Sequence, residues 1–147
     1  MPTKNDLENA LKDAMRAGDD LRKRTLRMAL AAVRFAEIEK GVELDEPVIL
    51  AILQKEIKSR QEAITDAERA NRPDLASANT AEIAILEGFL PAALSSSELE
   101  VLAQQAITEV GATEPRDMGR VMKVLIPRLQ GRATGDQASQ VVRRLLQ

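Results

Sequence analysis

Apolar residues recur along the chain at the three- and four-residue spacing of amphipathic helices, and no segment sustains the two-residue alternation of a strand. The pattern predicts four helices before Pro91. The first helix carries Leu7, Leu11 and Met15, and the second covers residues 21–40 and is closed by Gly41. The third has Asp45 as N-cap and Pro47 in its first turn, and its apolar residues are Ile49, Leu53, Ile57 and Ile64. The fourth carries Leu75, Ile83, Leu86 and Leu90.

The segment "FLPAALSSSELE" (residues 89–100) interrupts this pattern and predicts an internal boundary. Pro91 disfavours helical geometry at the preceding residue. Two capping boxes can start the next helix, Ser95 with Glu98 or Ser97 with Glu100. Three shorter helices follow, namely one with Leu99, Leu102, Ala106 and Val110, closed by Gly111; one from Arg116, which Pro127 should kink or end; and one over residues 136–147. We therefore predict an all-α protein with an N-terminal four-helix domain, residues 1–92, and a C-terminal three-helix domain, residues 93–147.

The amino-acid composition excludes several classes of catalytic and metal site. Hydrophobic residues (44%) and charged residues (30%) are in the proportions of a soluble globular protein, but Cys, His, Trp and Tyr are all absent. A disulfide framework, a Cys/His zinc site, a thiol nucleophile and a His-dependent triad are therefore excluded. The sequence shows neither a glycine-rich phosphate loop nor a cluster of carboxylates for Mg²⁺. We expect no cofactor, no metal and no catalytic residue, so that any chemistry would belong to a partner.

No segment has the length and apolar character of a membrane span or of a secretory signal. From the sequence alone we expect a cytoplasmic protein that makes no contact with membranes.

Charge is distributed unevenly over the C-terminal part. Residues 95–114 contain four Asp or Glu and no Lys or Arg, whereas residues 116–147 contain seven Lys or Arg and two Asp. A net charge of −2 for the whole chain thus conceals a local excess of five positive charges. A surface of this kind can attract phosphate even on a chain that is nearly neutral.

The segment "DMGRVMKVLIPRLQGRATG" (residues 117–135) carries most of these cations. At 100° per residue, Arg116, Arg120 and Lys123 share one arc, opposite an apolar face of Met118, Val121, Met122, Leu125 and Leu129. Gly131 and Gly135 would permit a tight turn that leaves Arg132 exposed. In the last helix Arg143 and Arg144 point away from the apolar face of Val141, Val142 and Leu145. The candidate nucleic-acid-binding residues are Arg116, Gly119, Arg120, Lys123, Arg128, Gly131, Arg132, Arg143 and Arg144.

Two interpretations of these cations remain open. Lys and Arg side chains point to solvent by default, so the face can simply be solvated. As a binding surface it would contact phosphate and shape, because aromatic side chains for base stacking are almost absent, and this favours a folded RNA.

Polar residues also fall within the apolar arcs of the N-terminal helices. Glu56 and Arg60 lie among Ile49, Leu53 and Ile57, and Glu82 and Asn79 lie in the Leu75–Leu86 face. They can form a buried Glu–Arg–Glu cluster that fixes helix register, or a polar groove for a small ligand or peptide. On the second helix a stripe of Lys23, Arg27 and Arg34, set opposite Met28, Ala32 and Phe35, is either a solvated face or a second phosphate-facing surface.

Four separated segments carry a family resemblance, in order and spacing: "RMALAAVRFAEIEKG", "LQKEIKSRQEAI", "AEIAILEGFLP" and "DMGRVMKVLIPRLQGRATG". Nearly end to end, the chain resembles the free-standing YqeY-like (GatB/YqeY-domain) proteins. Its "GRVMK", "GRA" and "VVRRLL" are similar to the end of the tail domain of GatB, a component of the aspartyl/glutamyl-tRNA amidotransferase.

The resemblance implies a helical N-terminal domain and a small three-helix C-terminal module. In the amidotransferase the tail contacts the body of the tRNA, while other parts of the enzyme transfer ammonia derived from glutamine to an acyl group on the tRNA. Residues that match the tail motif are Gly119, Arg120, Lys123, Gly131 and Arg132. Thr134-Gly135 departs from the family pattern, which leaves the shape of the last turn open.

Two functions follow as hypotheses. The chain is an accessory protein that binds tRNA or another structured RNA, related to carbon–nitrogen ligases with glutamine as amido-N-donor by family association alone. Alternatively, it is an adaptor that docks on an enzyme complex, such as the amidotransferase subunits, through its acidic fifth helix or an exposed Met118 and Met122.

Overall fold

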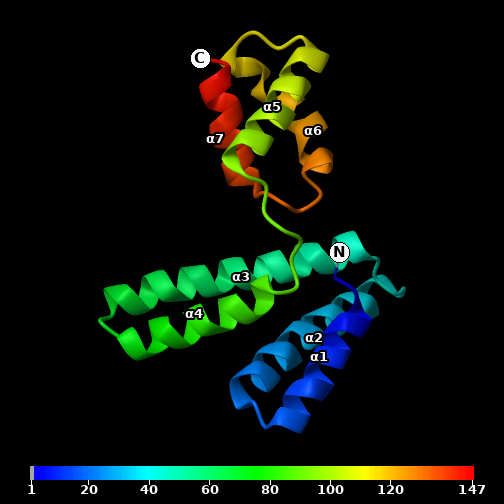
Figure 1. The fold of residues 1–147 in the computed structure, drawn as a ribbon, viewed down its shortest axis with the longest axis vertical. Helices are drawn as coiled ribbons and strands as arrows, with labels where there is room; N and C mark the ends of the chain where they lie inside the picture. Colours follow the sequence, from blue (N-terminus) through cyan, green and yellow to red (C-terminus); the bar gives the residue numbers. More distant parts are fainter. Residues whose placement is uncertain (1) are drawn as a thin grey trace. The chain divides into compact units, whose positions relative to one another are not determined.

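The computed structural model describes residues 2–147, and every regular element in that range is helical. The prediction of an all-α protein is confirmed. The α-helices, labelled in Figure 1, are α1 (Lys4–Ala17), α2 (Asp20–Lys40), α3 (Glu46–Arg69), α4 (Pro73–Glu87), α5 (Ser96–Val110), α6 (Met118–Leu129) and α7 (Gly135–Leu145). A 3₁₀ turn, η1 (Pro115–Asp117), precedes α6.

The helix ends follow local capping chemistry. Ser95 and Glu98 form the capping box of α5, so the alternative pair at residues 97 and 100 is not used. Gly41 and Gly111 close α2 and α5 in the left-handed conformation, as their positions predicted. Asp45 precedes α3, although its side chain makes no capping hydrogen bond.

The chain divides into two compact units, Met1–Leu90 and Pro91–Gln147. In the N-terminal unit α1 packs against α2 and α3 against α4, and α2 also contacts both α3 and α4. The apolar core lies between these helices, where Leu26, Val33, Leu53 and Leu86 are fully buried. This unit places α2 between its neighbours and leaves one side of it outside the core.

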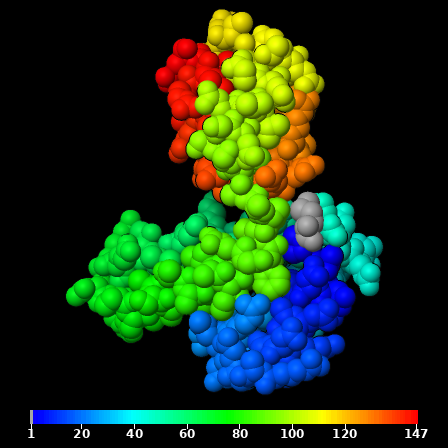
Figure 2. All heavy atoms as spheres, viewed as in Figure 1, coloured from blue at the N-terminus to red at the C-terminus, as the bar shows by residue number. Residues whose placement is uncertain are grey.

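The C-terminal unit is a bundle of α5, α6 and α7, and each of these helices contacts the other two. In the space-filling view yellow-green α5 lies between red α7 and orange α6 (Figure 2). Small residues of α5, Ala103 and Ala106, allow the larger Val121, Leu125 and Val142 to be fully buried.

Several residues expected in apolar cores lie elsewhere. Leu75, in the first turn of α4, and Met15, in the last turn of α1, are 45% and 53% exposed. Leu90 lies after the end of α4, but it is partly buried and still packs against the N-terminal core. Met28 and Phe35 were expected on an apolar face, but α2 turns a different set of side chains, around Leu26 and Val33, toward the core.

The prediction that Pro127 would end its helix is wrong, since Arg128 and Leu129 follow it in α6, whereas the alternative prediction of a kink stays a prediction. Residues Met118 to Leu129 form one helix with Pro127 inside its last turn, and the helix ends when Gln130 adopts φ +50°. A proline so close to the end removes one hydrogen bond from the exposed side. Burial of Leu125 and Leu129 on the other side holds the turn in place.

Candidate nucleic-acid interface

The apolar underside of α6 orients the cations of its outer face. Val121, Leu125 and Leu129 are buried in the C-terminal unit, whereas Arg120 and Lys123 are both exposed. Arg116 is exposed as well, but it lies in the 3₁₀ turn η1 and not on the helix. The sequence therefore predicted the outward direction of these side chains, although not the element that carries Arg116.

Arg120 is engaged within the protein. Its Nη1 donates to the carbonyl oxygen of Val110 at 3.0 Å, and its Nη2 pairs with Asp117 at 3.0 Å. The Asp117 carboxylate also accepts from the backbone N–H groups of Thr113 and Glu114. The Thr113 N–H and then the Arg120 guanidinium hold the pKa of Asp117 below its usual value. Arg120 thus links the end of α5 to the start of α6.

Three other arginines of the interface, Arg116, Arg128 and Arg144, pair with acidic residues that precede them in the sequence. Arg116 Nε lies 2.6 Å from Glu114, Arg144 Nη2 lies 3.3 Å from Glu100, and Arg128 pairs with Glu109. Residues 91–147 contain seven Lys or Arg and six Asp or Glu, so this unit has a net charge of +1. The charges that are separated along the sequence therefore lie together in space.

These ion pairs leave the guanidinium groups accessible. The side chains of Arg116 and Arg144 are 82% and 64% exposed, and exposed pairs of this kind contribute only about 0–1 kcal/mol. A phosphate can replace the carboxylate at a small cost in free energy.

Arg132 was predicted to be exposed, and this prediction is wrong. It is half-buried, and its Nε donates to the carbonyl oxygen of Ala92 at 2.8 Å. Its own carbonyl accepts from the N–H of Leu94, so it holds the segment before α5 against the α6–α7 turn. That turn is formed by Gln130 and Gly131, both with positive φ, whereas Gly135 begins α7 with an ordinary φ.

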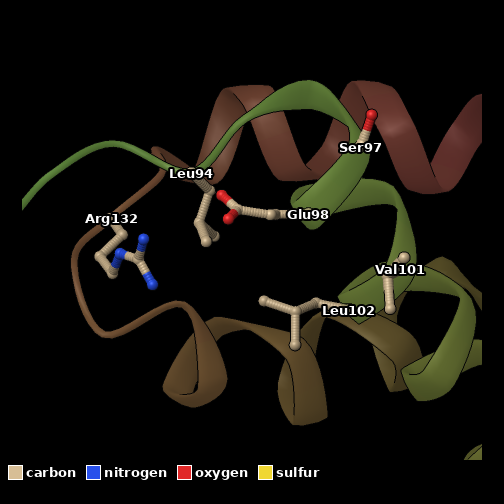
Figure 3. A pocket seen from close by; sticks show the side chains of 6 residues that line it. All are labelled: Leu94, Ser97, Glu98, Val101, Leu102 and Arg132. Carbon is tan, nitrogen blue, oxygen red and sulfur yellow. The ribbon is translucent and has the colours of Figure 1, made fainter.

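Arg132 also borders a shallow pocket of the C-terminal unit (Figure 3). Leu94 and Leu102 project toward its centre, and Glu98 faces Arg132 across its upper side. The Ser95 backbone N–H, then the Ser95 hydroxyl and the Arg132 charge, lower the pKa of Glu98. The other residues that line the pocket are Ser97 and Val101.

Within residues 2–147, Lys123 and Arg143 are the cations of the C-terminal unit for which the structure shows no partner, and both are exposed. Gly119 is exposed too, and a Cβ added there would meet no atom within 4 Å. No internal contact therefore requires glycine at this position of α6.

The polar residues of the N-terminal helices form a compact cluster. Arg60 is 5% exposed, and its guanidinium pairs with Glu56 at 2.9 Å and Glu82 at 3.0 Å. Arg24 adds a second, more exposed contact to Glu82 at 3.3 Å. Asn79 does not join the cluster, because its side chain donates to the Leu75 carbonyl of its own helix. In this arrangement the charges of Arg60, Glu56 and Glu82 are paired with one another, as the buried-cluster interpretation predicted.

Sequence reasoning missed two contributors to these sites. Asp117 and Arg24 were not singled out, and both join residues that were. The i, i+3 spacing of Asp117 and Arg120 is a signal that would have found the first pair. Arg24 and Glu82 are 58 positions apart, so local spacing carries no signal for the second.

Within residues 2–147, no helix combines the length and the apolar character required to cross a bilayer. No three acidic side chains of that range lie close enough together to hold a metal ion.

The sequence of this chain is similar to those of several curated yeast proteins. The proteins named "Altered inheritance of mitochondria protein 41, mitochondrial" are 36% identical in Kluyveromyces lactis and 34% identical in Lachancea thermotolerans, each over 113 residues, which is 74% of this chain and 60% of the relative. The Vanderwaltozyma polyspora protein of the same name is 34% identical over 96 residues, 65% of this chain and 52% of the relative. The chain thus spans little more than half the length of these curated relatives.

The names of these relatives contradict the expectation of a cytoplasmic protein, since all three are named as mitochondrial. That expectation rested on the N-terminal sequence and on composition, and neither determines the compartment of a helical protein without cysteine.

One family model, described as "Yqey-like protein", matches residues 4–146 and so spans both compact units. The chain belongs to the YqeY-like family.

Proposed function

We propose that the chain is an accessory protein that docks on a structured RNA, with tRNA as the first candidate, through the outer surface of α6 and α7. The observation that supports this most directly is the pair of exposed, unpartnered cations Lys123 and Arg143. They stand on adjacent helices of one small bundle that also carries Arg116 and Arg144, whose carboxylate partners phosphate can replace.

The near-neutral C-terminal unit sets the expected strength of this contact. Two unpaired cations release about two counterions when they meet phosphates, and each exchanged arginine pair adds to that number. Binding should therefore be weak at physiological salt and independent of base sequence. This suits a module that positions an RNA held mainly by another protein.

The family resemblance supports a setting in tRNA-dependent amidation. In this proposal the chain contributes contact with the RNA, while transfer of ammonia from glutamine belongs to a partner enzyme. The absence of His and Cys from the sequence is the reason for assigning the carbon–nitrogen ligase chemistry to that partner, since the common bases and thiol nucleophiles of such reactions are missing.

The test compares Lys123→Ala with Arg143→Ala as a double variant, and a control of Lys55→Ala with Lys58→Ala on α3 that removes the same charge. The slope of log K against log salt for bulk tRNA should become shallower by about two for the first variant, because two phosphate contacts are lost. The control should bind as the wild type does. Anisotropy titrations from low to physiological salt measure both, and equal slopes for all three proteins would refute the proposal.

Gly119→Ala separates stability from binding at the same surface. The added methyl group meets open space, and alanine favours a helix over glycine, so the free energy of unfolding should rise by about 0.5–1 kcal/mol. A backbone that approaches RNA closely would lose affinity from the same change. Urea denaturation and tRNA titration of one preparation measure the two effects. Unchanged affinity with raised stability would remove Gly119 from the interface.

An adaptor function is the second candidate, and a specific observation on the N-terminal unit favours it. The side of α2 that faces away from the core carries large exposed apolar residues. That surface serves a protein partner better than an RNA.

A further inference from the structure

One side of α2 and the residue after its cap carry an apolar stripe exposed to solvent. We call Met28, Phe35, Ile38 and Val42 the α2 stripe; their exposed fractions are 50%, 69%, 82% and 61%. The exposed Ala31 lies among them. Residues 28 and 35 are seven apart, and residues 31 and 38 lie beside them, so these four share one face of α2; Val42 follows the cap at Gly41.

The Met28 sulfur accepts from Arg60 Nη2 at 3.7 Å, but the core does not account for the rest of this face. The buried residues of α2 are Thr25, Leu26, Ala29, Leu30 and Val33, and at 100° per residue they centre on the side opposite Phe35. When a helix is apolar on two opposite sides and only one side packs in the core, we expect the other side to be covered by a partner. Exposed Phe and Ile side chains at helical spacing are typical of a protein contact surface.

Charge borders the α2 stripe asymmetrically. Along one edge stand Arg27 and Arg34, both exposed and without a partner within residues 2–147. The opposite edge carries Glu39. A surface with an apolar centre and one cationic edge selects a partner with the complementary edge.

We propose that the α2 stripe is the docking surface for an amphipathic helix of a partner protein, whose apolar stripe is bordered on one edge by Asp or Glu. Leucine-sized side chains would pack around Phe35, with the small Ala31 leaving room beside it. Carboxylates along the neighbouring edge would meet Arg27 and Arg34. This surface belongs to the N-terminal unit and does not depend on RNA binding by α6 and α7.

A second copy of this chain fits the charges less well. An antiparallel two-fold pair brings like edges together and would set Arg27 and Arg34 against their own copies. A parallel pair offers Glu39 to Arg34 by the five-residue offset of neighbouring helices, but it offers only Ala32 to Arg27.

An anionic membrane is also a poorer match. Glu39 and Glu43 lie at the end of the α2 stripe that carries Ile38 and Val42, where anionic lipid would repel them. Residues 1–90 contain 14 Lys or Arg against 17 Asp or Glu, a net charge of −3. A partner helix with Asp or Glu along one edge alone can pair with Arg27 and Arg34 without setting carboxylates against Glu39 and Glu43.

The experiment uses the full chain and two synthetic helical peptides. Both carry leucine at heptad positions a and d; one has glutamate along one edge, and the other has lysine at the same positions. The wild type should bind the glutamate peptide in anisotropy titrations, and Phe35→Ala with Ile38→Ala should weaken that binding at least about tenfold. Arg27→Glu with Arg34→Glu should reverse the preference in favour of the lysine peptide. Because every changed residue is exposed, circular dichroism of the variants should match the wild type.

Four results would overturn the proposal. They are binding of neither peptide, equal binding of both, a wild-type dimer in light scattering that Phe35→Ala dissociates, and co-sedimentation with phosphatidylserine vesicles that is lost in the same variant. The third result would assign the stripe to a second copy, and the fourth to a lipid surface. None of them changes the tRNA titrations of the Lys123 and Arg143 variants, so the two proposals fail separately.

Discussion

Arg60→Ala is expected to lower the free energy of unfolding of the N-terminal unit by about 3–5 kcal/mol. The guanidinium is almost fully buried and holds two carboxylates of which Glu82 is the more buried, at 12% exposure, and Glu56 the less, at 25%. Without Arg60 these carboxylates lose their buried counter-charge, and only Arg24 remains near Glu82. A loss of this size is a large share of the stability of an ordinary domain.

The matched control removes the charges together. Arg60→Met with Glu56→Gln and Glu82→Gln keeps similar volumes and leaves no uncompensated buried ion, since Arg24 is exposed, so it should cost much less than the single change. Urea denaturation followed by circular dichroism measures both. If Arg60→Ala costs no more than about 1 kcal/mol, the cluster behaves as an exposed ion pair and does not fix the register of α3 against α4.

Leu125→Ala is expected to destabilise the C-terminal unit by about 2.5–5 kcal/mol. Leu125 is fully buried at the centre of the α5–α6–α7 core, and its truncation leaves a cavity that three short helices cannot easily close. A unit this small buries a limited apolar area, so the change should bring it close to unfolding at room temperature.

Hydrogen exchange read by mass spectrometry locates the effect. Amides of α5, α6 and α7 should exchange faster, while those of the N-terminal unit keep their protection, because each unit has its own core. The neighbouring Ile126→Ala, at a position 44% exposed, should change little. Equal loss of protection in both units would mean that the chain unfolds as one cooperative body.

Helix positions and ends were predictable from sequence because their causes are local. Gly41 and Gly111 close helices that stop where the apolar period stops, and Ser95 with Glu98 starts α5 through contacts three residues apart. The pairing of Glu56 with Arg60 could also be predicted from the sequence, since both residues share one arc of one helix. Periodicity and capping are short-range signals, so they survive without knowledge of the fold.

The partners of the C-terminal cations could not be predicted in the same way. Arg144 and Glu100 are 44 positions apart, and Arg132 and Ala92 are 40 apart, so only the packed bundle brings each pair together. Counting charge by segment therefore overstated the positive character of this unit. For α2, period alone identified an apolar face, but the neighbouring helices decide which face is buried, and Phe35 lies on the other one.

The pairing of α1 with α2 and of α3 with α4 has a consequence for synthesis. Helices that adjoin in sequence meet without closing long loops, so such a topology folds rapidly. The first 90 residues contain all the partners of their own core and can fold on the ribosome while the remaining helices are still being translated.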